Sequence, residues 1–422
     1  MRAIARPAVS LLFFSLGLVE SPSKEDDTRM AHKRQVSLPA LLRFCDRMGV
    51  SVLLEGLRAQ RKRPHISTSM ITRSLVAGFM FNVGSLLKMD KFFRKEPVRQ
   101  ALQCRRPGVA SDTTVARVLE VMDVGQVLSC VRWVADAFVR HGLGGCSFAT
   151  ARGRAGIVDG TAWGGFFCSV VMEHGTIPLF HGVSRIPRLG KELPVSLRLI
   201  AKVARRFTWM LADGLYACLS FFELCARLGV KGIVKTRSKT LCIVRQAQAL
   251  FRAFPKGGPE VDYAAGFDAE RGCLYQAWAA QNLSWGQAWD KCPLRFNVIR
   301  VEETYVKGSR KGHRLFHVIS QDASLGAASG REAGHGRWGI ESAFKAANAA
   351  VHTKRQLTRN PKVALLINAF EAIAFMILSA FGEWLDKNEE HMRDLWDHGR
   401  LALGTLQDEL WASLSPAEPE SS

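Results

Sequence analysis

The chain has 422 residues, of which 47% are hydrophobic and 23% are charged, and its formal net charge at pH 7 is +20. This composition excludes a disordered chain, and the length allows one catalytic domain with one or two smaller ones. The excess of Lys and Arg indicates a polyanionic partner, with nucleic acid ahead of an anionic membrane surface. The ten cysteines show no C-x-x-C spacing, which disfavours a zinc site or a disulfide framework.

The N-terminal segment, residues 1–33, has basic residues followed by an apolar run from Ala8 to Val19, which is the order found in signal peptides. The unpaired cysteines and the basic composition that follow are not typical of a secreted protein. We therefore expect an extension, or a true translation start near Met30, and a cytoplasmic protein associated with the nucleoid.

Residues 34–145 show helical periodicity. Ser67 is a candidate N-cap for one helix, and Ser111 for another. Basic residues cluster within 58–63, 94–99 and 105–106. Each cluster is either a solvated helix face or a set of phosphate contacts, and we weigh these readings equally. With the net charge, the pattern predicts a helical DNA-binding region.

Strands and helices alternate over residues 150–237, after a glycine-rich break. This alternation predicts a mixed α/β sheet covered by helices. The expected helices span 192–206 and 220–228. The expected strands begin at 157 and span 166–171, 177–183, 209–212 and 232–235.

Residues 238–322 change character, because short alternations of apolar and polar residues with Gly and Pro punctuation predict a mostly β insertion. Residues 323–390 are helical again, and 391–422 read as a C-terminal helix and tail. Within this part, Val363 to Phe381 is long enough to span a membrane. Asn368 and Glu371 interrupt it, so we expect a buried helix and no stable membrane association.

Two aspartates end buried apolar runs in the same way. Asp159 lies in GIVDGTAW and Asp213 lies in WMLADGLYA, each followed directly by glycine. A strand end places a carboxylate at the rim of a sheet, and glycine lets a ligand approach the backbone. One Asp-Gly is an ordinary turn signal, but two in matching contexts predict a site.

A third carboxylate, Glu341, lies on an amphipathic helix in HGRWGIESAFK. Its spacing to Lys345 also fits a surface ion pair. Three converging carboxylates would repel one another unless cations lay between them. Oxygen ligands suit two Mg²⁺ or Mn²⁺ ions, which can activate a nucleophile and stabilise the leaving oxygen in an attack at phosphorus.

The motifs VDGTAW, LADGLYA and HGRWGIESAFK, in this order, resemble the signature blocks of the DDE transposases of bacterial insertion sequences. The resemblance covers about Leu38 to Phe381, and it is closest to members with a β-strand insertion between the second Asp and the Glu. It implies a ribonuclease-H-like core formed by 150–237 and 323–390. It also implies catalysis by Asp159, Asp213 and Glu341 with two metal ions.

The same resemblance implies a protein that binds double-stranded DNA at the inverted repeats of its element, cuts the ends and joins them to target DNA. Such a protein would act as a homodimer. By position, Arg337 matches an arginine that contacts DNA, and Trp338 the aromatic residue beside it. The chain has Gly334 and Asn348 where the best-described members have Tyr and Lys. Candidates for the remaining DNA contacts are His335, Lys345, Lys354 and Lys191.

Other functions stay open at this point. A metal-dependent nuclease on the same fold would carry the same carboxylates. An inactive DNA-binding descendant would usually have lost one of them, and all three are present. A peripheral membrane protein is the alternative outside nucleic acid, because of the charge and the two apolar segments.

Overall fold

The structure is a computed structural model. It describes residues 36–62, 64–102, 111–143, 153–188, 190–286, 293–306, 311–388 and 400–414. The expectation for residues 1–33 lies outside the described residues, as do Arg63, Arg105 and Arg106 of the basic clusters.

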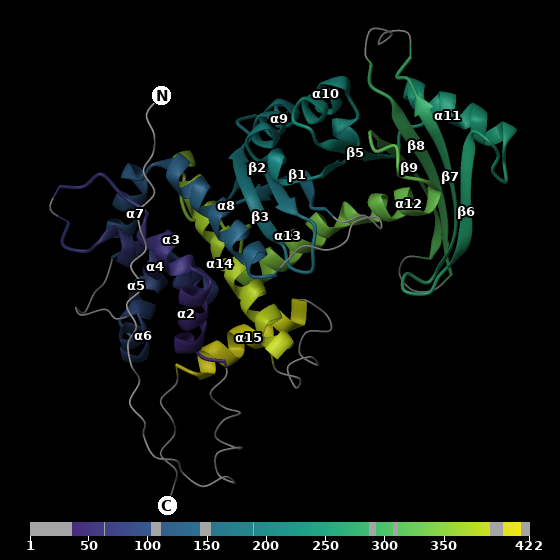
Figure 1. Ribbon diagram of the computed structural model, residues 1–422. Coiled ribbons are helices and arrows are strands. Elements are labelled where there is room, and N and C mark those ends of the chain that lie inside the picture. The colour runs from purple at the N-terminus through teal and green to yellow at the C-terminus, as the bar shows by residue number, and fades with distance from the viewer. Residues whose placement is uncertain are drawn as a thin grey trace, which may run out of the picture.

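A nine-stranded sheet in the order β3-β2-β1-β4-β5-β9-β8-β7-β6 crosses the molecule (Figure 1). Strands β1, β4 and β5 are parallel, whereas β2 runs antiparallel to both β1 and β3. Strands β9, β8, β7 and β6 follow β5 as an antiparallel meander. The predicted mixed α/β sheet is therefore confirmed. The strands are β1 Ala155–Trp163, β2 Phe166–Glu173, β3 Leu179–Arg185, β4 Trp209–Ala212, β5 Lys231–Thr236, β6 Val261–Asp268, β7 Cys273–Leu283, β8 Phe296–Tyr305 and β9 Gly312–Ser320.

Helices cover both faces of the sheet, so the central strands are buried on both sides. Alternate residues of β1 point to opposite faces, so that Ile157 and Val158 belong to different hydrophobic clusters. The Val158 face packs against α9 Glu192–Val203, α10 Leu219–Arg227 and α11 Cys242–Ala253. The Ile157 face packs against α12 Ala327–Gly336, α13 Trp338–Val351 and α14 Pro361–Asn388.

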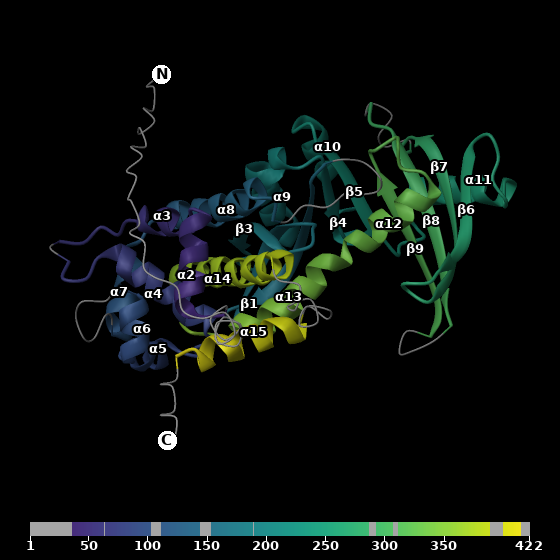
Figure 2. The same cartoon turned by 60° about the horizontal axis from the view of Figure 1, so that its bottom comes forward.

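The N-terminal part is helical, as predicted, and packs on α14 at the end of the molecule opposite the insertion (Figures 1 and 2). Ser67 accepts the Met70 N–H at 3.1 Å and Ser111 accepts the Thr114 N–H at 3.2 Å, so both N-caps are confirmed. These helices are α2 Leu38–Arg47, α3 Val50–Glu55, α4 Thr68–Met80, α5 Leu86–Phe93, α6 Glu96–Ala101, α7 Asp112–Val121 and α8 Val124–Arg140.

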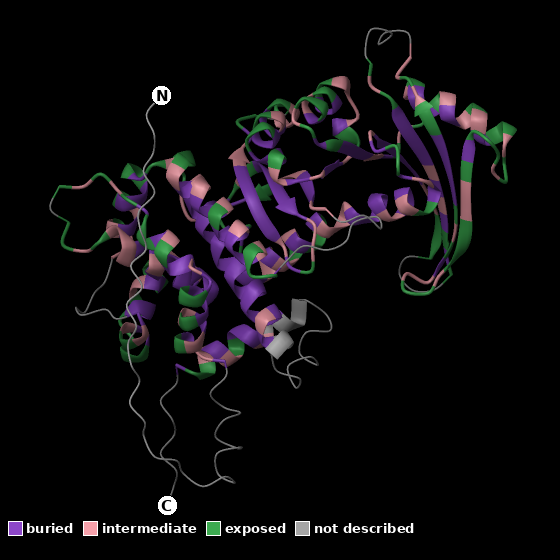
Figure 3. Cartoon of the chain, in the orientation of Figure 1, coloured by how far each residue is buried: buried purple, intermediate pink, exposed green. Residues whose placement is uncertain are grey.

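Helix α14 contains the apolar segment of membrane-spanning length. Its most apolar stretch is almost entirely buried, between the N-terminal helices and β1 to β3 (Figure 3). Its interior polar residues are used: the Trp163 indole N–H donates to Glu371 at 2.5 Å, and Asn368 donates to the Trp163 carbonyl at 3.3 Å. The predicted buried helix is confirmed, and the two polar residues fasten it to the β1–β2 hairpin.

The segment 238–322 departs from the prediction at one element, because α11 precedes its four strands. The sequence CIVRQAQALFRA buries Ile243, Val244, Ala247 and Phe251, which is helical spacing, so the prediction of a mostly β segment is wrong for these residues. The four strands also extend the central sheet directly from β5. After α13 and α14 the described chain ends in α15 Arg400–Ala412, where a C-terminal helix was expected.

Candidate functional site

Asp159 and Asp213 lie side by side because their strands are adjacent and parallel. Ile157 of β1 pairs with Leu211 of β4, and each aspartate lies two residues further on. Asp213 directly follows the end of β4, as predicted, but the strand end predicted at Asp159 is wrong, because β1 stays paired with β2 as far as Trp163. The Asp213 carboxylate accepts the Leu215 N–H at 3.0 Å and caps the short 3-10 helix Gly214–Tyr216. Burial raises the pKa of Asp159 to about 6; Arg337 opposes this rise, and Asp213 adds to it. The two carboxylates therefore share one electrostatic site.

Arg337 connects this site to Glu341, which lies in the first turn of α13. One Arg337 nitrogen lies 3.3 Å from an Asp159 carboxylate oxygen, and another pairs with the Glu341 carboxylate. The side chain of Arg337 is only 11% exposed, whereas that of Glu341 is 46% exposed. The guanidinium thus occupies the position between the two carboxylates and neutralises part of their charge.

The three predicted carboxylates do not form a preassembled metal site. Among the described residues, no group of three or more His, Cys, Asp or Glu side chains is close enough together to hold an ion. Their chemistry nevertheless fits Mg²⁺ or Mn²⁺, because all the donors are carboxylate oxygens. In this structure Arg337 contacts both Asp159 and Glu341, so its guanidinium lies where an ion shared by these two carboxylates would lie.

A fourth carboxylate, Glu192, was missed in the sequence. It lies in the first turn of α9 and faces Gly160, where an added Cβ would come within 2.6 Å of the Glu192 carboxylate. Burial and the charge of Asp213 raise the pKa of Glu192. The Tyr216 hydroxyl donates to Ser196 at 2.8 Å and lies 3.4 Å from Glu192. The available signal was the glycine after Asp159, whose missing side chain makes room for Glu192.

Lys235 of β5 is a second residue that the sequence analysis missed. Its ammonium lies 3.7 Å from the centre of the Trp338 ring and 4.0 Å from that of Phe316, and it donates to the Gly334 carbonyl at 3.0 Å. Burial, and then Arg337, lowers the pKa of Lys235 to about 7. A lysine on the face of a buried strand was the signal that could have revealed it.

The predicted contact residues around Arg337 have different environments. Trp338 begins α13 and packs against Lys235, whereas His335 is buried and its ring lies 2.6 Å from the Glu303 carboxylate. Gly334 packs tightly, since a Cβ there would come within 2.7 Å of the Phe316 ring. The structure therefore packs Trp338 against Lys235, while the His335 ring is turned inward to a hydrogen bond with Glu303.

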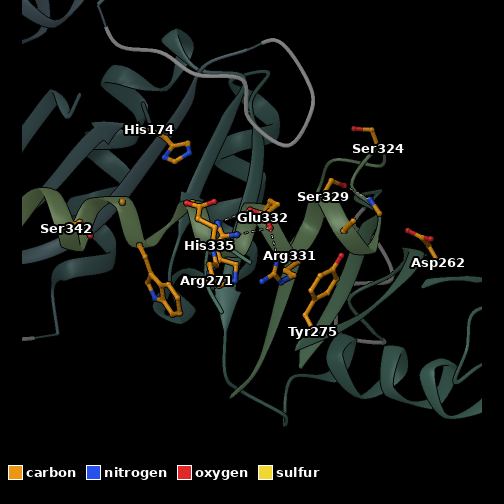
Figure 4. A pocket seen from close by; sticks show the side chains of 16 residues that line it. His174, Asp262, Arg271, Tyr275, Ser324, Ser329, Arg331, Glu332, His335 and Ser342 are labelled. Carbon is orange, nitrogen blue, oxygen red and sulfur yellow. Dashed lines mark hydrogen bonds and ion pairs between the residues drawn. The ribbon is translucent and has the colours of Figure 1, made fainter. Parts of the chain in front are cut away.

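His335 belongs to a charged network that lines a cavity of about 1080 Å³ beside α12 and α13 (Figure 4). At its centre, Arg331 contacts Asp268 and Glu303, each at 2.8 Å. Arg271, in the turn between β6 and β7, contacts Asp268 at 2.7 Å. This network fixes α12 to the inserted strands, and so positions the start of α13.

The remaining predicted lysines are exposed. Lys191 directly precedes α9, and Lys345 lies one turn after Glu341 on α13. Lys354 is also exposed, and its backbone N–H donates to the Asn348 side chain at 3.1 Å. All three are open to solvent, as a contact with DNA would require.

Comparison with known proteins adds no relative. No model of a protein family matches the chain, and no curated protein matches it.

Proposed function

We propose that the chain is a DNA transposase of the DDE type, in which Asp159, Asp213 and Glu341 hold two Mg²⁺ or Mn²⁺ ions. The observation that carries this proposal is the meeting of two carboxylates from adjacent parallel strands with a third from α13, bridged by Arg337. The net charge of +20 supports a DNA substrate.

The sheet topology supports a ribonuclease-H-like core within the mixed α/β fold. Asp159 lies on the first strand, which is central in the β3-β2-β1-β4-β5 part of the sheet. Asp213 follows the strand beside it, and Glu341 lies on a helix that packs against β1. The inserted strands β6 to β9 lie in the chain between Asp213 and Glu341, where a β-rich insertion was expected.

In this proposal the bound ions would activate water or a 3′-hydroxyl and stabilise the leaving oxygen at phosphorus. Asp159 and Asp213 supply ligands from the rigid sheet, and Glu341 supplies one from the exposed start of α13. Arg337, once released from the carboxylates, presents its planar donor group to a DNA phosphate. We propose that two copies of the chain bring the two DNA ends together.

The test is metal-dependent cleavage of DNA that carries the element's ends. Asp159→Ala, Asp213→Ala and Glu341→Ala should each abolish cleavage and leave DNA binding largely intact. Glu223→Ala, at an exposed carboxylate on α10, is the matched control and should cleave normally. Full cleavage by any of the three site variants would remove the assignment. Cleavage by the unaltered protein without joining of ends would favour a nuclease.

A further inference from the structure

A row of side chains crosses four strands on the sheet face that α11 covers. Thr236 of β5 pairs in register with His317 of β9, His317 with Arg300 of β8, and Arg300 with Trp278 of β7. Side chains directly opposite each other in a sheet point to the same face with Cβ atoms about 5 Å apart. The four residues therefore form a continuous cross-strand row.

Two neighbours in this row carry buried polar atoms without partners. His317 is 0% exposed, and neither of its ring nitrogens has a hydrogen-bond partner among the described residues. The Nε of Arg300 is also buried and unpartnered, although the guanidinium stacks over Trp278 at 5.3 Å and pairs with Glu302. Leaving a buried polar group unpaired costs roughly 1–3 kcal/mol. Two neighbouring side chains with unpaired polar atoms therefore indicate a ligand that accepts or donates hydrogen bonds there.

The charges around the row select the kind of species. Burial, then Arg300, then Lys239 lower the pKa of His317 to about 4, so its ring is neutral at pH 7 and retains one N–H donor. Lys239 is exposed on the segment between β5 and α11. Glu302 neutralises part of the Arg300 charge, and Lys239 adds a second cation. An oxyanion can accept hydrogen bonds from both the Arg300 Nε and the His317 ring N–H.

We propose that His317, Arg300 and Lys239 form a phosphate-binding site on the sheet face that α11 covers. The Arg300 Nε and a His317 ring N–H donate to phosphate oxygens, and Lys239 adds charge at the rim. Thr236, the first residue of the row, lies close to Asp213. An added Cβ on Gly214, the residue after Asp213, would lie 3.1 Å from the Thr236 hydroxyl. The ligand is a free phosphate or a DNA backbone phosphate, and the second source rests on the proposed function.

The first test measures the melting temperature of the full chain in inorganic phosphate, with ionic strength held constant by chloride. Phosphate at about ten times its Kd should raise the Tm by about 2 °C. His317→Phe and Arg300→Gln should lose this rise. Arg245→Gln, at an exposed arginine on α11, is the control and should retain it. Lys239→Gln alters only an exposed side chain, so it tests the site even if the buried variants fold poorly.

The second test follows binding of end DNA by fluorescence anisotropy over a range of salt. If the ligand is a DNA phosphate, Arg300→Gln and Lys239→Gln each reduce the slope of log K against log salt by about one. If these variants change only the phosphate-dependent Tm, the ligand is free phosphate and the site still stands. The site is overturned if neither measurement depends on Arg300 and Lys239, or if His317→Phe keeps the full phosphate response, since the orphan atoms then bind water alone.

The phosphate measurement separates this inference from the proposed function, because it uses neither metal nor DNA. Loss of the phosphate response in the site variants supports the inference even if Asp159→Ala still cleaves DNA. The converse result is that Asp159→Ala abolishes cleavage while Arg300→Gln keeps the full phosphate-dependent rise in Tm. That result would remove the phosphate site and leave the proposed function in place.

Discussion

At the residue scale, Arg337 decides the electrostatics of the candidate site. It contacts Asp159 and Glu341 at once and is almost buried, so it acts as a fixed cation between two carboxylates. Charge-assisted hydrogen bonds of this kind contribute about 1.5–3 kcal/mol. A metal ion entering between the same carboxylates must therefore compete with this arginine.

This competition predicts that Arg337→Ala binds Mn²⁺ more tightly than the unaltered protein, by about tenfold, in the absence of DNA. The substitution removes a cation that must otherwise be displaced, which corresponds to about 1.4 kcal/mol. Isothermal titration calorimetry of the free protein measures the affinity. Arg337→Lys keeps the charge and should lie between the two. Equal or weaker Mn²⁺ binding by Arg337→Ala would show that the arginine does not compete with metal.

At the element scale, α14 shows how a helix of membrane-spanning length becomes the core of a globular protein. The sequence predicted the helix and its burial, since polar residues interrupt the apolar run. It did not predict the partner, because Trp163 lies 208 residues away from Glu371. Burial raises the pKa of Glu371 to about 8, opposed by the Trp163 hydrogen bond, so the folded protein holds this carboxyl in its neutral form at pH 7.

The neutral Glu371 makes stability depend on pH. Below about pH 4.5 the Glu371 carboxyl is protonated in both the folded and the unfolded protein, so its full contribution to the free energy of unfolding is present. Between 4.5 and about 8 only the unfolded state ionises, so stability falls by about 1.4 kcal/mol per pH unit from this group. Glu371→Gln should remove this fall and raise the Tm at pH 7.5. Calorimetry at several pH values tests it, with Glu223→Gln as the exposed control. Parallel curves for Glu371→Gln and the unaltered protein would contradict the prediction.

Local sequence patterns predict some of the helices and strands and miss others. The end of β4 follows from its apolar run, and the caps Ser67 and Ser111 follow from their side chains. The end of β1 does not, because its pairing with β2 continues past Asp159 into polar and small residues. Helix α11 was missed because its apolar spacing was read within a region dominated by strands. Nor does local pattern reveal that β9 pairs with β5, since strand pairing depends on segments far apart in the chain.

At the scale of the whole molecule, the positive charge is only partly available to a partner. In the N-terminal helices, Arg94 pairs with Asp90 at 3.1 Å and Arg99 with Glu96 at 3.0 Å, while Lys95 stacks on Trp411. These contacts favour the structural reading for that cluster. Exposed ion pairs of this kind contribute little, so a DNA phosphate can still displace them.

The remaining charge predicts DNA binding that weakens steeply with salt. If six or more phosphates are neutralised, affinity should fall roughly a thousandfold between 50 and 200 mM salt. Fluorescence anisotropy with end DNA measures this, and Lys191→Gln and Lys345→Gln should each lower the slope by about one. Glu223→Gln should leave the slope unchanged. A nearly flat salt dependence would mean that the charge serves another partner.

The sequence by itself determined the strand that ends just before Asp213, the helix of Glu341 and the excess of positive charge, because period and local composition encode these features. Only the tertiary structure decided that Arg337 bridges the carboxylates, that Glu192 faces Gly160 and that His317 meets Arg300. These contacts join segments distant in the chain. Their energy comes from burial and from charges brought together by folding, and no local pattern records them.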